Sequence, residues 1–261
     1  MLECSAPLQG IPADVECVLS PVALIRMMSA VRRLDKIWYL KHIDVFAGVG
    51  ESEMQQIAER ATMREFARGN VILHPDEPQE MVYLIKEGRV KVSRYSPDGR
   101  EQILTLLEPG DFVGELALVK EAEPVHVEAF EDTLVCVLYR EDFVGLIRRQ
   151  PEVMLHVMKV LAERLRVAEE EIADLVFRDV SGRLASLLLR LAEAYGEKDG
   201  GRLRLTLRLT HHDIASMIGA TRETVTSTLS RFRDADLIVT EQRYIVIRNP
   251  EGLRRLTQKE P

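Results

Sequence analysis

The chain has 261 residues, of which 46% are hydrophobic and 30% charged, and its formal net charge is −7. This composition is typical of a soluble globular protein of about two domains, and no apolar run is long enough to cross a bilayer. Three cysteines without a pairing pattern argue against a secreted disulfide scaffold, so we expect a cytoplasmic protein.

Residues 1–36 form an N-terminal extension for which the sequence predicts no definite structure. Its first 30 or so residues show no hydrophobic period, and they lack the basic start and apolar core of a signal peptide. Translation that begins at Met27 or Met28 is an alternative that would remove most of this segment. Helical patterns follow at 29–40 and 51–61.

Residues 37–150 predict an antiparallel β-roll. Short apolar runs are separated by turn signals such as Pro-Asp-Gly and Pro-Gly-Asp, which is the pattern of closely spaced strands in a small barrel or roll. The strands are expected at 71–73, 82–85, 90–95, 102–107 and 133–139.

Residues 151–178 predict one long helix. Its apolar residues alternate in steps of four and three, which is the heptad pattern of two helices packed side by side. This stripe consists of Met154, Met158, Leu161, Leu165, Ala168, Ile172 and Leu175. We expect it to form the interface of a parallel homodimer; the alternative is that the stripe packs on the β-roll of its own chain.

Residues 179–261 predict a winged helix-turn-helix. Thr210 and Thr221 have the character of helix N-caps, and Gly219 between them suits a helix stop. A preceding helix is expected at 180–195, a charged loop at 197–201, a strand at 203–209 and a wing hairpin at 237–240 and 244–247.

The second helix of this motif, 222–233, has the properties of a recognition helix. One face is apolar and the other carries side chains that can bond base edges in a major groove. The expected DNA contacts are Thr210, His211, Thr221, Arg222, Glu223, Thr226, Ser227 and Arg231. Residues 203–261 hold ten basic and seven acidic side chains, so this end is positive although the chain is negative.

The stretch LTHHDIASMIGATRETVTSTLSRF resembles the DNA-binding motif of the bacterial CRP/FNR regulators (cyclic-AMP receptor protein and fumarate-nitrate reduction regulator). The resemblance continues through YLIKEGRVKV, EPGDFVGELAL and AFEDTLVCVL, and covers residues 42–249. It implies an α+β chain that binds DNA with two-fold-related half-sites as a homodimer, with RNA polymerase as a further partner. The family reads a half-site similar to TGTGA, and one usual Arg contact falls here on Ser227.

The resemblance also places an effector pocket at Gly114, Glu115, Leu116 and His126. Cyclic-nucleotide binders use such a Gly-Glu pair for the ribose and a following Arg for the phosphate. Here the corresponding stretch, EAEPVH, has two acids and no Arg, and Ala168 and Glu169 replace hydroxyl residues on the long helix. We therefore expect an effector other than cyclic AMP; a purely structural turn at Gly114 is the alternative.

The cysteines and histidines leave three alternatives for a cofactor. Cys136 matches the internal cluster-binding cysteine of the oxygen-sensing branch of the family, and Cys4 and Cys17 are the only other thiols. With a fourth ligand they could hold an iron–sulfur cluster. The alternatives are a haem, for which His74, His126 and His156 stand isolated in the sequence, and a Cys136 that is simply part of the core.

The sequence thus predicts a transcriptional regulator switched by an unidentified small molecule or redox signal. An enzyme is not expected, because no nucleophile–base set or phosphate loop is present. The second hypothesis is a ligand-binding regulatory module that controls a partner protein through the helical hairpin.

Overall fold

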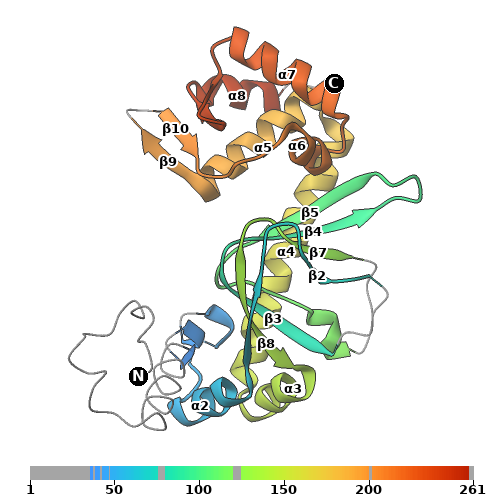
Figure 1. The fold of residues 1–261 in the computed structure, drawn as a ribbon. Helices are drawn as coiled ribbons and strands as arrows, with labels where there is room; N and C mark the ends of the chain where they lie inside the picture. Colours follow the sequence, from blue (N-terminus) through green and yellow to red (C-terminus); the bar gives the residue numbers. More distant parts are fainter. Residues whose placement is uncertain are drawn as a thin grey trace, which may run out of the picture.

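The computed structural model describes residues 36–37, 39–41, 43–46, 48–75, 80–119, 125–199 and 202–258. Two sheets form the roll in the lower half of Figure 1. One sheet has the order β1-β8-β3-β6 and the other β2-β7-β4-β5, and every pair is antiparallel. The strands are β1 (Thr62–Phe66), β2 (Val71–Leu73), β3 (Met81–Glu87), β4 (Val90–Tyr95), β5 (Glu101–Leu107), β6 (Phe112–Val113), β7 (His126–Ala129) and β8 (Thr133–Tyr139).

Short helices close the lower end of the roll. They are η1 (Asp44–Phe46), α2 (Glu51–Arg60), η2 (Glu115–Val119) and α3 (Arg140–Arg149). Phe46 of η1 and Phe143 of α3 meet edge to face at 6.1 Å and are almost fully buried. A core of apolar side chains from these helices and from β3 and β8 therefore fills this end.

The long helix α4 (Pro151–Phe177) leaves the roll and runs up to the C-terminal domain (Figure 1). Proline at its first turn needs no hydrogen-bond donor, so it starts the helix without cost. Val153 and Val157 are fully buried against the roll. Beyond Phe177 the chain turns at Arg178, and Asp179 caps the next helix by accepting from the Gly182 amide at 2.7 Å.

The C-terminal domain packs the apolar faces of its helices on a small sheet of order β11-β12-β10-β9. Its elements are α5 (Val180–Tyr195), β9 (Gly196–Asp199), β10 (Arg202–Leu205), α6 (His211–Ile218), α7 (Arg222–Asp234), β11 (Ile238–Glu241), β12 (Tyr244–Ile247) and α8 (Pro250–Thr257). Gln242 and Arg243 both have positive φ (50° and 70°), as the two-residue turn of a tight hairpin requires. This hairpin is the wing.

The roll and the C-terminal domain share apolar contacts. Phe130, which follows β7, is buried in the same cluster as the core of the C-terminal domain, and Leu106 of β5 packs against it. The Arg89 guanidinium lies 5.2 Å from the centre of the Tyr195 ring at the end of α5. The C-terminal domain therefore rests on the edge of its own roll.

The predicted fold class is confirmed: a β-roll, a long helix and a winged helix-turn-helix follow one another along the chain. Two local expectations were wrong. The strand expected at 203–209 ends at Leu205, where its pairing with β9 stops. The expected loop at 197–201 begins as strand β9, because Gly196–Asp199 pairs in register with β10. No helix among the described residues is long and apolar enough to cross a membrane.

Candidate nucleic-acid interface and effector pocket

The turn between α6 and α7 is fixed by local hydrogen bonds. The Thr210 hydroxyl accepts from the Asp213 amide (3.1 Å), and the Asp213 carboxylate accepts from the Thr210 amide (2.8 Å). Gly219 ends α6 in the left-handed conformation, with φ 61°, and the Thr221 hydroxyl caps α7 by accepting from the Thr224 amide. The predicted helix-turn-helix is confirmed.

One face of α7 is buried and the other is open to solvent. The buried face consists of Val225, Thr228, Leu229 and Phe232, which pack in the core of the domain. The open face includes Arg222, Glu223, Thr226 and Ser227, all exposed. The first two turns of the helix therefore present their polar side chains outward, where a major groove can receive them.

His211 links the two helices of the motif. Its Nδ1 lies 2.7 Å from Oγ1 of Thr226, and that hydroxyl donates to the Arg222 carbonyl. Burial, together with the charges of Arg233 and Arg222, lowers the pKa of His211 below its usual value. His211 therefore lies among the residues that were predicted to contact DNA, with its ring tied to the start of α7.

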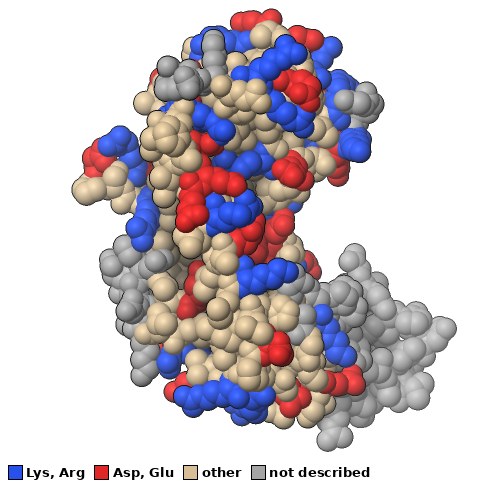
Figure 2. Space-filling model, turned by 180° about the vertical axis from the view of Figure 1, so that it is seen from behind, with Lys and Arg blue, Asp and Glu red and all other residues tan. Residues whose placement is uncertain are grey.

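Arg231 lies apart from the other predicted DNA contacts. Its guanidinium donates to Ser181 of α5 (2.9 Å) and to Thr228 (3.2 Å). Nine residues after Arg222, it occupies the opposite side of the exposed face. The surface around these side chains is not uniformly basic: Figure 2 shows basic and acidic side chains interleaved over the visible face of the C-terminal domain.

A cavity of about 170 Å³ lies in the roll beside α4. Three of the four predicted effector residues line it: Gly114, Glu115 and Leu116. Its other walls are Leu73, Val92, Leu104, Thr105, Val113, Val125 and Arg164. The fourth predicted effector residue, His126, does not line the cavity. Its ring instead meets the Tyr95 ring edge to face at 4.8 Å and the His74 ring at 6.2 Å.

Gly114 has a backbone that only glycine accepts easily. Its φ is 93°, and a Cβ there would come within 2.4 Å of the Met81 carbonyl oxygen. Gly114 therefore allows the turn to pass close to β3, and the next residue, Glu115, lines the cavity. One carboxylate oxygen of Glu115 is buried without a hydrogen-bond partner. The acidic stretch 121–124, expected beside it, lies outside the described residues.

Arg164 of α4 is the pocket residue that the sequence analysis missed. It donates to the other oxygen of the Glu115 carboxylate (2.9 Å) and to the Phe112 carbonyl, and its guanidinium lies 5.1 Å from the centre of the Phe112 ring. A signal was present: Arg164 continues the row Val153, Val157 and Val160 in steps of four and three. That row faces the roll.

Two family models match the two halves of the chain. Residues 63–150 match the cyclic nucleotide-binding domain, and residues 182–256 match the Crp-like helix-turn-helix domain. The chain is similar to the CRP-like cAMP-activated global transcriptional regulator of Mycobacterium tuberculosis, with 35% identity over 217 residues. This alignment covers 83% of the chain and 97% of the relative.

Further similarities agree. The cyclic AMP receptor protein of Thermus thermophilus is 32% identical over 200 residues, which cover 76% of the chain and 89% of that protein. The crystal structure of a CRP/FNR-family transcriptional regulator from Thermus thermophilus matches with a TM-score of 0.65 at 27% identity, over 77% of this chain and 100% of that one. The chain belongs to the CRP/FNR family of transcriptional regulators.

In this CRP/FNR regulator the heptad stripe of α4 is not covered by its own chain. All seven members are exposed: Met154, Met158, Leu161, Leu165, Ala168, Ile172 and Leu175. A different row of α4, which begins with Val153 and Val157, packs on the roll. The alternative that the stripe packs on its own β-roll is therefore wrong.

Cys136 of this regulator lies on β8, between Met63 of β1 and Leu84 of β3, and is fully buried. Burial raises the pKa of its thiol to about 11. Cys4 and Cys17 lie outside the described residues, and the described part of the chain holds no group of three or more metal-binding side chains.

Proposed function

We propose that this CRP/FNR regulator is a homodimer that binds two-fold-related DNA half-sites and responds to a signal other than cyclic AMP. The observation that carries the proposal is α7: capped by Thr221, buried on one face and presenting Arg222 and Glu223 on the other. Such a helix start suits guanine and cytosine edges, because Arg donates bidentately and Glu accepts from the cytosine amino group.

The exposed stripe of α4 supports the homodimer. Leu165 and Ile172 are about 60% exposed in the single chain (61% and 60%), which is costly for side chains of this size. A second copy packed in parallel would cover them and place two recognition helices on one side of the molecule. The dimer, once bound to DNA, would then contact RNA polymerase.

The pocket supports an effector other than cyclic AMP, although one relative is named as cAMP-activated and another as a cyclic AMP receptor protein. The only basic side chain among the described walls of the pocket, Arg164, is already paired with Glu115. A cyclic phosphate would have to displace that carboxylate or lie beside it.

The test is a binding-site selection from random DNA with the purified full-length chain, followed by titrations at several salt concentrations. A regulator should enrich one sequence in inverted pairs, and its affinity should fall as salt rises because phosphate contacts release counterions. Enrichment of no sequence, with no salt-dependent binding, would favour the alternative: a module that controls a partner protein.

A further inference from the structure

The row of α4 that faces its own chain changes character halfway along the helix. It continues in steps of four and three from Val153, Val157 and Val160 to Arg164, Val167, Glu171, Asp174 and Arg178. The first part is apolar and packs on the roll. The last part is charged and meets α5 of the C-terminal domain. The helix thus joins the two domains by different chemistry at its two ends.

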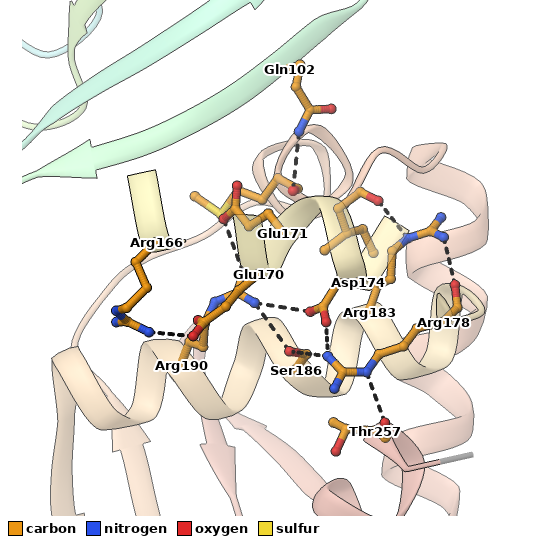
Figure 3. Close-up of polar contacts among 12 residues, drawn as sticks. Gln102, Arg166, Glu170, Glu171, Asp174, Arg178, Arg183, Ser186, Arg190 and Thr257 are labelled. Atoms are coloured by element: carbon orange, nitrogen blue, oxygen red, sulfur yellow. Dashed lines mark hydrogen bonds and ion pairs between the residues drawn. The ribbon is translucent and has the colours of Figure 1, made fainter. Parts of the chain in front are cut away.

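The charged end forms a cluster around one carboxylate, which we call the hinge clamp: Glu171, Asp174, Arg178, Ser186 and Arg190 (Figure 3). Asp174 pairs with Arg178 through one oxygen and with Arg190 through the other (3.2 Å). Both arginines also donate to the Ser186 hydroxyl, at 3.1 and 3.2 Å, and Arg190 reaches Glu171.

The clamp is connected to the rest of the C-terminal domain. Arg178 donates to the Thr257 carbonyl of α8 (2.9 Å), and its own carbonyl accepts from Arg183. Arg183 in turn donates to the Ile218 carbonyl at the end of α6 (3.0 Å; Figure 3). Hydrogen bonds therefore link Asp174, through Arg178 and Arg183, to α8 and to the end of α6, where the turn of the DNA-binding motif begins.

The apolar contacts between the two domains come from Phe130 and Leu106 of the roll and not from the upper half of α4. None of residues 161–177, all of which the structure describes, belongs to one of the three hydrophobic clusters. The Asp174 side chain is only 13% exposed, so its charge needs a partner, and each of its oxygens has an arginine. The polar contacts that the upper half of α4 makes with Arg178 and α5 are therefore these directional ion pairs, next to the core that the roll shares with the C-terminal domain.

We propose that Asp174 is a positioning residue for DNA binding: its carboxylate fixes the angle between the dimer helix and α5, and so the separation of the two recognition helices. This inference rests on the proposed homodimeric DNA-binding function. Asp174 touches no part of the predicted DNA surface, so it acts on the distance between half-sites and leaves the reading of each one unchanged.

The experiment compares full-length wild type, Asp174→Asn and Asp174→Glu on DNA duplexes. Glu170→Gln is the matched control, because Glu170 is an exposed carboxylate of α4 that pairs with Arg166 outside the clamp. Each duplex carries two copies of the half-site selected by wild type, and the spacer between them varies one base pair at a time. A duplex with a single half-site and a thermal melt of each protein complete the set.

Wild type and Glu170→Gln should prefer one spacer. Asp174→Asn should lose on the order of tenfold in affinity for that spacer and discriminate less against its neighbours. Its affinity for the single half-site should stay within about twofold of wild type. Asp174→Glu, which keeps the charge, should recover most of the preference.

An unchanged spacer profile in Asp174→Asn would overturn the inference. So would an equal loss on single and paired half-sites together with a lower melting temperature, since that is a purely structural effect. If Asp174→Asn does not fold, Arg190→Gln opens the clamp from α5 and is compared in the same way. A wild type without sequence or spacer preference would instead overturn the proposed function itself.

Discussion

Two arginines on α7 have different surroundings, and only one of them is expected to read bases. Arg222 lies at the exposed start of the helix, whereas Arg231 donates to Ser181 of α5. The two side chains have the same charge and lie on the same helix, but they face different surroundings. They therefore form a matched pair for testing which arginine reads DNA.

Replacing Arg222 with alanine should cost on the order of 1–3 kcal/mol on the preferred site and relax specificity at one guanine. Arg231→Ala removes the same charge and should leave the base preference unchanged. The measurement is a binding-site selection with each protein, followed by titration on the preferred and a random duplex. If Arg222→Ala weakens both duplexes equally, Arg222 only holds the DNA backbone.

Labelling of Cys136 tests whether this buried thiol of the roll can react with a reagent in solution. Because burial raises its pKa to about 11, the thiol stays protonated at neutral pH and should not react with a chromogenic disulfide reagent until the protein unfolds. The protein for this test carries Cys4→Ser and Cys17→Ser, so that Cys136 is the remaining thiol.

Rapid labelling of folded protein near neutral pH would contradict this interpretation. A second readout is iron: anaerobic reconstitution of the unmodified chain should give the same iron content with Cys136→Ser as without it. Iron that is lost with this substitution would identify Cys136 as a ligand and reopen the cluster hypothesis.

At the scale of elements, α4 carries two apolar rows in different surroundings. The row of Val153 and Val157 is covered by the roll, and the stripe that contains Leu165 is exposed. Leu165→Glu would place two carboxylates against each other in an apolar dimer interface, and unpaired buried charge is strongly unfavourable. We expect the variant to be monomeric at low micromolar concentration.

Sedimentation measures this directly. Lys159→Glu is the control, because Lys159 is exposed on α4 but outside the stripe. It should sediment like wild type. A Leu165→Glu protein that still sediments as a dimer would contradict the assignment of the interface.

Several elements could be predicted from local sequence because their signals are local. The bounds of β2, β4 and β8 agree with the predicted ones, and the caps of α6 and α7 lie where Thr210 and Thr221 were expected. By contrast, β9 has the sequence Gly-Glu-Lys-Asp and forms only because β10 pairs with it. Tertiary pairing overrode composition there.

The candidate site was predicted unevenly for a similar reason. Gly114, Glu115 and Leu116 form a contiguous motif, so they were found together. Arg164 lies about fifty residues away on another element, and its role depends on which row of α4 faces the roll. His126 was assigned by neighbourhood in sequence, but on β7 it meets Tyr95 and lies off the cavity lining.

At the scale of the whole molecule, the proposed function requires that an effector in the pocket alters the predicted DNA surface. Cyclic AMP should neither bind at micromolar concentration nor change DNA affinity, because Arg164 is paired with Glu115. Calorimetry with cyclic AMP and cyclic GMP measures binding, and the DNA titration is repeated with each. Micromolar affinity for either nucleotide would show that the Arg164–Glu115 pair opens for a phosphate.

Phe130 and Leu106 belong to the roll but complete the core of the C-terminal domain. The two domains are therefore not interchangeable modules. A hybrid in which this C-terminal domain is fused to an unrelated sensor would leave apolar surface uncovered where Phe130 now lies, and it would tend to aggregate. An engineer who recombines such regulators should carry the 106 and 130 positions across with the reading domain, or redesign the surface they cover.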